Sequence, residues 1–516
     1  MEGTLWAFLP AVIAIVLALV TKQVYVSLFL GIFVGAMMYA GGNPLNAMFT
    51  LFQVMSEKVG ANTPIIVFLV VLGILVVLLQ KSGGAKAYGD WAGKKIKSKG
   101  GALGATAALG CLIFVDDYFN CLTVGSVMRP VTDKFKISRA KLAYIIDSTA
   151  APVCIIAPIS SWAAAVAGEL EGDGLMVFIS TIPFNVYAIL TLIMVFALCI
   201  FKFDFGKMKK NELIAETTGD LHAGAEGNSE GSAEIIANPR GKVHHLVIPV
   251  IILIICCIGG MLFTGFFYNW DTGLIGSELQ SANVIEAFSN CDAGMSLAIG
   301  STFALIIIAI YYMIARVVSF KEITGSFTEG FKAMVPAILI LTFAWSISGI
   351  MGAKGGYLDA QSFVAENLAN SAFPQFLFPA IFFILAGAIA FATGTSWGTF
   401  GVLVPIAVTI LGSSGTMVLL TVSATLGGAV FGDHISPISD TTILASAGAE
   451  CNHVDHVNTQ LPYAMSVAAI AAVSYVIAGL CASLGGVLCG VIMWASALVL
   501  FAGLVLIFKM AGKKKA

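Results

Sequence analysis

Gly432-Asp433-His434-Ile435-Ser436-Pro437-Ile438-Ser439-Asp440-Thr441-Thr442 interrupts an apolar segment that runs from Val418 to Gly448. A carboxylate at the centre of a bilayer costs about 2.5 to 3.5 kcal/mol on insertion scales, and a proline removes a helical hydrogen bond. Irregular backbone at membrane depth is stable only where it is buried in protein or lines a cavity. The pattern therefore predicts a broken transmembrane helix whose break faces a polar site.

The rest of the chain is also strongly apolar. Of its 516 residues, 58% are hydrophobic and 11% are charged, whereas soluble domains carry roughly 25% charged residues. Apolar runs long enough to cross about 30 Å of hydrocarbon recur from Leu5–Val20 to Val487–Phe508. No basic residue precedes the first run and no cleavage site is clear, so we interpret it as a retained span. We predict an all-α polytopic membrane protein with about 11 spans and two hairpins.

The basic residues predict the orientation of these spans. By the positive-inside rule, the segments rich in Lys and Arg are cytoplasmic. They are Lys81 to Lys99, Arg129 to Lys141, Lys202 to Lys242, Arg316 to Lys332, and the tail Lys513-Lys514-Lys515. We therefore expect a multi-pass protein of the plasma membrane, with its N-terminus outside and its C-terminus in the cytoplasm.

Two segments predict re-entrant hairpins. Residues 101–128 have basic loops at both ends but are too few for two crossings of roughly 20 residues each. The polar tip of this hairpin is Phe114-Val115-Asp116-Asp117-Tyr118-Phe119-Asn120. Residues 373–410 must likewise return to the side they came from if the basic tail is to end inside. Their polar centre is Thr393-Gly394-Thr395-Ser396-Trp397-Gly398-Thr399.

Each hairpin precedes a segment that we expect to be a broken helix. The first, 142–167, is interrupted at Asp147-Ser148-Thr149-Ala150-Ala151-Pro152, and the second is 418–448. The same order of elements in opposite orientations is typical of an inverted-topology repeat. We expect the first repeat at 1–203, a cytoplasmic polar linker at 204–244, the second repeat at 245–485, and an extra span with a basic tail at 486–516. The polar composition of the linker is typical of a tether with little hydrophobic material to fold around.

The breaks carry the residues that could bind an ion. Na⁺ is a hard cation that takes oxygen ligands from carboxylates, hydroxyls and the carbonyls that an unwound helix exposes. The candidate ion- and substrate-binding residues are Asp116, Asp117, Asn120, Asp147, Ser148, Thr149, Thr393, Thr395, Ser396, Asp433, His434, Ser436, Ser439, Asp440 and Thr441. The predicted Na⁺ ligands among them are Asp117, Asp147, Thr395, Asp433 and Asp440. Any single carboxylate could instead cap a half-helix, and a hydroxyl could bond the preceding turn.

A buried carboxyl group beside a like charge can hold either a proton or a cation near neutral pH. Competition between the two is sufficient for exchange, since Na⁺ displaces a proton on one side and a proton displaces Na⁺ on the other. His434, beside Asp433, could add a proton site or could hold the break by hydrogen bonds.

Other chemistries find less support in the sequence. No nucleotide-binding motif of the Walker type is visible, so nothing indicates transport driven directly by ATP. Glu450 to His456 fits no standard zinc spacing, and we interpret it as a solvated loop. An intramembrane enzyme would need a positioned nucleophile and base or a metal. We expect no catalytic residue, no cofactor and no nucleic-acid partner.

The stretch from Gly432 to Thr442 resembles the NhaC family of sodium/proton antiporters. Gly394-Thr395-Ser396-Trp397-Gly398-Thr399 and the segment from Asp147 to Pro152 also resemble motifs of that family, and the similarity covers nearly the whole chain. The resemblance implies an ion-coupled transporter built from inverted repeats with two hairpins, and an elevator-like motion is one way in which it would work. Some members of the family exchange organic anions such as malate for lactate, so the resemblance leaves the cargo open.

Two functions therefore stay open at this point. The first is secondary active antiport of Na⁺ against H⁺ by alternating access, indicated by five acidic residues at helix breaks. The second is Na⁺- or H⁺-coupled transport of a small organic solute, an amino acid or a carboxylate. The aromatic residues that could surround such a solute are Tyr118, Phe119, Trp162, Trp345 and Trp397. The expected partners are the lipid bilayer, Na⁺, H⁺ and this solute, and homodimerisation stays open.

Overall fold

Helices make up nearly all of the computed structural model, which describes residues 3–21, 23–114, 117–158, 160, 162–163, 166, 174–224, 238–269, 273–276, 279–351, 357–369, 374–411 and 415–513. The elements before the polar linker, with one in it, are η1 (Leu5–Phe8), α1 (Leu9–Thr21), α2 (Val24–Tyr39), α3 (Pro44–Ala61), α4 (Thr63–Lys81), α5 (Gly84–Lys95), α6 (Lys99–Leu112), α7 (Asp117–Lys134), α8 (Arg139–Ser148), α9 (Ala151–Cys154), α11 (Gly174–Thr181), η2 (Ile182–Phe184), α12 (Val186–Phe201) and α13 (Gly206–Thr218).

The elements after the linker include two short antiparallel strands. They are α14 (His244–Phe267), β1 (Tyr268–Asn269), β2 (Leu274–Ile275), α15 (Val284–Asn290), α16 (Ala293–Ala315), α17 (Phe320–Met351), α18 (Ala360–Ala369), η3 (Gln375–Leu377), α19 (Phe378–Thr393), α20 (Ser396–Leu411), α21 (Thr416–Ile435), α22 (Asp440–Ala449), α23 (His453–Cys481), η4 (Ala482–Leu484) and α24 (Gly486–Lys513).

The all-α polytopic fold predicted from the sequence is confirmed. Among the described residues, eight helices are long and apolar enough to cross a membrane, or up to nine if α2 and α3, which meet at 119°, form one span. Large apolar side chains such as Ile255 of α14, Ile314 of α16 and Val487 of α24 are exposed on the surface of the molecule, as expected for helices that face lipid. The number of about 11 spans stays a prediction.

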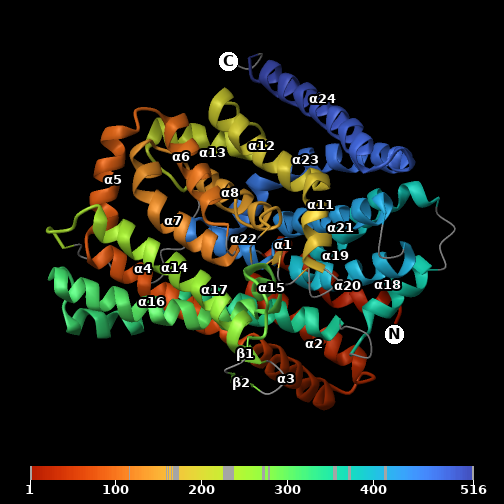
Figure 1. Ribbon diagram of the computed structural model, residues 1–516, viewed down its shortest axis with the longest axis horizontal. Coiled ribbons are helices and arrows are strands. Elements are labelled where there is room, and N and C mark those ends of the chain that lie inside the picture. Colours follow the sequence, from red (N-terminus) through yellow and green to blue (C-terminus); the bar gives the residue numbers. More distant parts are fainter. Residues whose placement is uncertain are drawn as a thin grey trace.

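The helices pack in two groups that meet along α7, α17 and α22 (Figure 1). In the first group, α4 packs against α16 and α17, α14 packs against α16, and α2 packs against α1 and α17. In the second group, α19 packs along α21, α22 packs against α7 and α8, and α23 packs against α21 and α24. The predicted site residues lie mainly in the second group.

Close packing of α19 on α21 depends on glycines. A Cβ at Gly428 would lie 2.2 Å from the carbonyl oxygen of Phe383, and one at Gly432 would lie 2.1 Å from that of Gly387. Small residues at an interface let membrane helices approach closely where the hydrophobic effect cannot drive them together. These glycines therefore set the position of the second break.

The structure interrupts its helices at four places near the predicted tips and breaks. α6 ends at Leu112 and α7 begins at Asp117, while α8 ends at Ser148 and α9 begins at Ala151. In the other half, α19 gives way to α20 across Gly394 and Thr395, and α21 gives way to α22 across residues 436–439. The predicted site residue Asp116 lies outside the described residues. The inverted orientation of the halves stays a prediction.

Part of the polar segment 204–244 differs from the expected tether, because it contains helix α13. This helix packs against α8 and α23. Glu212 of α13 accepts a 2.8 Å hydrogen bond from the backbone N–H of Ser138 and forms a 2.7 Å ion pair with Lys99. Asn211 donates a 2.7 Å hydrogen bond to Asp455. Glu212 and Asn211 therefore join α13 to neighbouring segments of the protein.

Candidate functional site

Asp147, in the last turn of α8, and Asp433, in the last turn of α21, are both fully buried. Two consecutive threonines at the start of α22 hold them. Thr441 Oγ1 donates a 2.7 Å hydrogen bond to Oδ2 of Asp433, and Thr442 Oγ1 donates a 3.0 Å hydrogen bond to Oδ2 of Asp147. One short helix thus joins a carboxylate from each half of the chain.

Each of these two carboxylates keeps one oxygen available. Oδ1 of Asp147 and Oδ1 of Asp433 are buried and have no hydrogen-bond partner among the described residues. A buried charged oxygen without a partner is costly, so each is suited to a cation or a proton. Within the described residues, no three His, Cys, Asp or Glu side chains form a metal cluster. A cation here would therefore also need hydroxyl, amide or backbone oxygens, which suits Na⁺ better than a transition metal.

Asp440 connects the same region to both hairpin tips. Its Oδ2 accepts a 2.6 Å hydrogen bond from the hydroxyl of Tyr118, at the start of α7. Its backbone N–H donates a 3.1 Å hydrogen bond to the carbonyl oxygen of Gly394, between α19 and α20. Gly394 has φ +69°, and a Cβ there would lie 2.3 Å from the carbonyl oxygen of Ile438. The left-handed backbone and the lack of space both require glycine at this tip.

Asn120 closes the first hairpin onto the break after α8. Its side-chain nitrogen lies 2.7 Å from the carbonyl oxygen of Gly110, 2.8 Å from that of Ile113 and 3.0 Å from that of Thr149. Thr149 in turn donates a 2.7 Å hydrogen bond from its hydroxyl to the carbonyl oxygen of Ile145. The structure therefore gives Asn120 and Thr149 positioning contacts with the backbone.

Several predicted hydroxyl ligands also bond to the backbone. Thr393 donates to Ile389 at 2.9 Å and Ser436 donates to Phe391 at 2.8 Å, in both cases to the carbonyl oxygen. Ser396 donates to the carbonyl oxygen of Ala429 at 3.3 Å. Ser439 caps α22, because its side-chain oxygen accepts a 3.0 Å hydrogen bond from the N–H of Thr442. These contacts hold the two breaks in place, and Ser148 lies buried at the end of α8.

Asp117 begins α7 and contacts an aromatic cluster. Its Oδ2 accepts a 3.0 Å hydrogen bond from the indole N–H of Trp162. The ring of Trp162 lies 5.3 Å from that of Trp397, and 5.4 Å from that of Phe400, between centroids. The two hairpins are therefore joined through these rings as well as through Asp440.

Gln460 of α23 fixes the proton position on a neighbouring histidine. Its Nε2 donates to Oδ2 of Asp147 at 2.6 Å and to the carbonyl oxygen of His434 at 2.9 Å. Because both partners only accept, the amide oxygen must face the other way, where Nε2 of His456 lies 3.0 Å from it. The amide oxygen also only accepts, so Nε2 of His456 carries a hydrogen. Nδ1 of His434 lies 3.0 Å from the hydroxyl oxygen of Tyr187.

Ser446 lies between two histidines. Its hydroxyl oxygen is 2.8 Å from Nδ1 of His456 and 3.1 Å from Nδ1 of His453, and the carbonyl oxygen of Thr442 lies 2.7 Å away. Nε2 of His453 is 2.8 Å from the carbonyl oxygen of Pro437, so it too carries a hydrogen. In neutral rings both Nδ1 atoms are then acceptors, and they compete with the carbonyl oxygen of Thr442 for the one hydroxyl hydrogen, which Ser446 donates to Thr442. The cluster can thus take up a proton and gain a hydrogen bond.

This cluster corrects one expectation. We interpreted Glu450 to His456 as a solvated loop, but His456 is fully buried in the first turn of α23. His456 Nε2 lies 3.9 Å from Oδ2 of Asp147. Our prediction of the site also left out Gln460. Gln460 follows His456 by four residues, and this helical spacing of polar residues before an apolar run was a signal for it.

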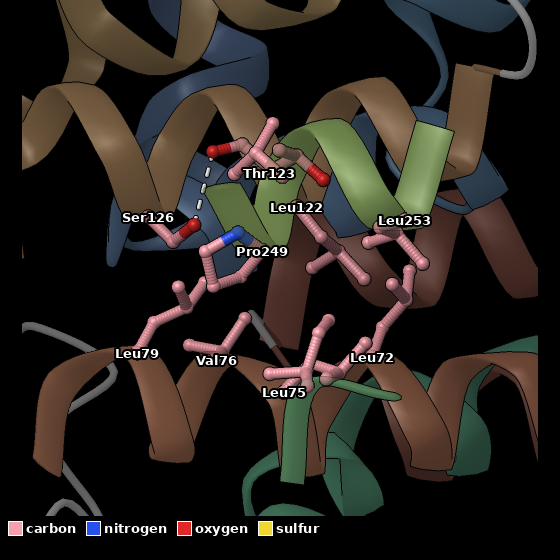
Figure 2. A pocket seen from close by; sticks show the side chains of 11 residues that line it. Leu72, Leu75, Val76, Leu79, Leu122, Thr123, Ser126, Pro249 and Leu253 are labelled. Carbon is pink, nitrogen blue, oxygen red and sulfur yellow. Dashed lines mark hydrogen bonds between the residues drawn. The ribbon is translucent and has the colours of Figure 1, made fainter. Parts of the chain in front are cut away.

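Two cavities lie near the site. A cavity of about 250 Å³ is lined by residues that include Lys58, Tyr118, Trp345, Thr395 and Trp397. Figure 2 shows a much smaller gap of about 20 Å³, lined mainly by Leu and Val side chains of α4, α7 and α14. Thr123 and Ser126 face this apolar gap, and Ser126 donates a 2.9 Å hydrogen bond to the carbonyl oxygen of Thr123. The larger cavity is the one that adjoins Asp440, through Tyr118.

The sequence model of the Na⁺/H⁺ antiporter family matches residues 173–480, more than half of the chain. The chain belongs to the Na⁺/H⁺ antiporter family. Together with its apolar helices, this membership makes it a multi-pass membrane protein and a secondary antiporter.

Two of the relatives that resemble part of this chain are named for different cargoes. An uncharacterized protein of Haemophilus influenzae is 39% identical, over 93% of this chain and 91% of its own length. The malate-2H⁺/Na⁺-lactate antiporter of Bacillus subtilis is 31% identical, over 31% of this chain and 33% of its own length. The arginine/ornithine antiporter of Halobacterium salinarum is 41% identical, over 22% of this chain and 24% of its own length. The last two matches span only a part of each protein.

Proposed function

We propose that this antiporter exchanges Na⁺ for H⁺ at a site formed by Asp147, Asp433 and Asp440. The observation that supports it is the pair of buried oxygens, Oδ1 of Asp147 and Oδ1 of Asp433, that have no hydrogen-bond partner among the described residues. The threonine hydroxyls hold the other oxygen of each carboxylate in place. The site is therefore ordered, acidic and incomplete without a cation or a proton.

Exchange follows from competition for these oxygens. When Asp147 and Asp433 are ionised, their free oxygens can bind Na⁺ together with the carbonyl oxygens of the break at residues 436–439. A proton on either carboxyl group removes the charge that holds Na⁺. If the site opens to one side at a time, Na⁺ and H⁺ leave on opposite sides. The antiparallel halves and the N-terminus outside the plasma membrane are part of this proposal.

The histidine cluster suits the proton half of the cycle. His456 lies close to Asp147, while His453 is the more exposed of the two histidines. Ser446 lies between their Nδ1 atoms. We include His453, Ser446 and His456 as the path by which a proton reaches Asp147, because histidines can pass protons near neutral pH. The last step, from Nε2 of His456 to Oδ2 of Asp147, spans 3.9 Å and needs a small movement of these side chains.

Proteoliposomes that contain the purified protein and a pH-sensitive dye test this proposal. An inward Na⁺ gradient should move protons outward, and Asp433→Asn should abolish the response. Asp90→Asn is the matched control, because Asp90 lies exposed on α5. The proposal is contradicted if Na⁺ drives no proton movement at any pH between about 6.5 and 9. This range was chosen around the pKa values of histidine and of buried carboxyl groups. An equal response in Asp433→Asn would show that exchange uses another site.

A second candidate function is Na⁺- or H⁺-coupled transport of a small organic solute. The names of two relatives given above describe them as antiporters of organic solutes. The observation that favours it here is the cavity of about 250 Å³, which is larger than an ion needs and is lined by two tryptophans.

A further inference from the structure

We infer that Lys58 binds the carboxylate of a small organic monocarboxylate in the cavity beside Tyr118. The inference deepens the proposed function, since it places this solute next to the ion site. It depends on the position of Lys58, on the partners of the neighbouring charges, and on the residues that line the cavity.

The Lys58 side chain crosses α17 at a glycine. Lys58 lies in the last turn of α3 and is partly buried. A Cβ at Gly349 of α17 would lie 2.6 Å from Cε and 2.7 Å from Cγ of Lys58. Any larger residue at position 349 would therefore displace the lysine stem. Trp345, one turn earlier on the same helix, lines the cavity together with Lys58.

The charge of Lys58 is not neutralised by the described part of the chain. The ion pairs between described residues use Lys81, Lys99, Arg129, Arg139, Lys141 and His456 as their cations. The adjacent Glu57 accepts hydrogen bonds from Gln53 at 3.1 Å and from Tyr357 at 3.0 Å instead. Among the described residues, the lining of the cavity includes one cation, Lys58, and no carboxylate. An ammonium group without a carboxylate partner at such a cavity favours an anion as its partner.

The charges that line the cavity limit the anion that it suits. Its volume of about 250 Å³ has room for a small organic solute. One lysine matches one carboxylate, so a second carboxylate on the solute would lie in the cavity without a partner. The cation of a basic amino acid would likewise lie near Lys58 without a carboxylate to pair with. The cavity therefore suits a monocarboxylate better than a dicarboxylate or a basic amino acid.

Other polar groups of the cavity wall can bind the rest of the solute. Tyr118, Thr395 and Asn62 line the cavity, as do the rings of Trp345 and Trp397. Hydroxyl and amide groups can bond an α-hydroxyl or an α-amino group, and aromatic faces attract an ammonium group. The shared chemistry is thus an α-substituted carboxylate, either a hydroxy acid or a small amino acid. Tyr118 also bonds to Asp440, so the solute lies one side chain away from the ion site.

Binding to the purified protein tests the inference directly. Trp345 and Trp397 are two of the seven tryptophans, so a solute in the cavity should change the tryptophan fluorescence. The probes are L-lactate and L-alanine, compared with L-malate and L-arginine, each with and without Na⁺. The variants are Lys58→Met, Lys58→Arg and Gly349→Ala. The controls on α17 are Lys332→Met, at an exposed lysine, and Gly325→Ala, where a Cβ would meet only Glu329 at 3.9 Å.

We expect saturable binding of lactate, of alanine, or of both, with malate and arginine at least tenfold weaker. Lys58→Met and Gly349→Ala should each weaken binding at least tenfold, Lys58→Arg should weaken it less, and both controls should bind normally. The inference is overturned if none of the probes binds, if the larger probes bind as well as the small ones, or if binding is unchanged in both Lys58→Met and Gly349→Ala. Should Lys58→Met fail to fold, Gly349→Ala decides, because only a flexible side chain has to move to admit its methyl group.

The same proteoliposomes separate this inference from the proposed function. Proton movement driven by Na⁺, together with no saturable binding of any probe, keeps the Na⁺/H⁺ exchange and rejects the solute. The opposite outcome is that a probe binds, but Na⁺ drives no proton movement either with or without the probe. It keeps the solute site and rejects the exchange.

Discussion

The hydroxyl of Tyr118 donates a 2.6 Å hydrogen bond to Oδ2 of Asp440, although 322 positions separate the two residues in the chain. Tyr118 lies in the first turn of α7, the second helix of the first hairpin, and Asp440 begins α22, the helix after the second break. Tyr118 also lines the larger cavity. This one contact therefore links the cavity, a hairpin tip and the carboxylates of the proposed ion site.

Replacing Tyr118 by Phe should lower the apparent affinity of the antiporter for Na⁺ while leaving the fold intact. The ring stays, but the ionised Asp440 loses a hydrogen bond, and bonds to charged groups contribute about 1.5 to 3 kcal/mol. We expect the Na⁺ concentration for half-maximal proton movement to rise about tenfold or more, at about 1.4 kcal/mol per tenfold. Tyr311→Phe is the control, because that hydroxyl contacts His244 instead. An unchanged Na⁺ requirement would exclude Asp440 from the site.

Thr442→Val should impair exchange more than Thr442→Ser. Valine keeps the shape of threonine but removes the hydroxyl that donates to Asp147 at 3.0 Å, whereas serine keeps the donor. Transport at limiting Na⁺ should fall about tenfold in the valine variant, which corresponds to about 1.4 kcal/mol. Flux of ²²Na⁺ into proteoliposomes measures it. Thr425→Val is a matched control, since Thr425 bonds only within α21, to the carbonyl oxygen of Thr421. Equal loss in the serine variant would argue for packing rather than the hydrogen bond.

Ser446→Ala should slow proton transfer without changing Na⁺ binding. The variant removes the hydroxyl between His453 and His456, and positioned proton-transfer groups accelerate reactions by about 10² to 10⁴. Stopped-flow dye measurements should show proton release slowed by roughly tenfold or more, with unchanged Na⁺ affinity in calorimetry. Ser474→Ala on α23, the helix of His453 and His456, is the control, because Ser474 bonds the carbonyl oxygen of Ile470. Normal proton kinetics in Ser446→Ala would remove the cluster from the path.

Gly394→Ala should destabilise the second hairpin. Its φ of +69° costs an alanine about 1 to 2 kcal/mol, and the new methyl group would lie 2.3 Å from the carbonyl oxygen of Ile438. Gly485→Ala separates the two effects, because Gly485 has φ +88° but nothing within 4 Å of a Cβ. The thermal unfolding midpoint in detergent should fall clearly further for Gly394→Ala. A similar fall in both variants would mean that the contact with Ile438 does not matter.

The sequence predicted where helices break but not what each break contacts. Asp433 and Pro437 are out of place in an apolar span, so their position can be read locally. Thr442 and Asp147 are 295 residues apart, and Gln460 and Asp147 are 313 apart. Nothing in either segment specifies these partners. The sequence did not predict a role for Lys58 for the same reason, because the role proposed here depends on the contact of its side chain with Gly349 in another helix.

Composition and charge by themselves determined that this chain is a multi-pass membrane protein with acidic breaks. That is so because the cost of a carboxylate in hydrocarbon acts on each segment independently of the rest. Only the tertiary structure decided which carboxylate oxygens of Asp147 and Asp433 accept hydrogen bonds and which are available to a cation or a proton. It also placed His456 beside Asp147 rather than in a solvated loop. Hydrogen bonds act over about 3 Å, so the packing of distant helices, not the order of residues, selects the pairs that form the site.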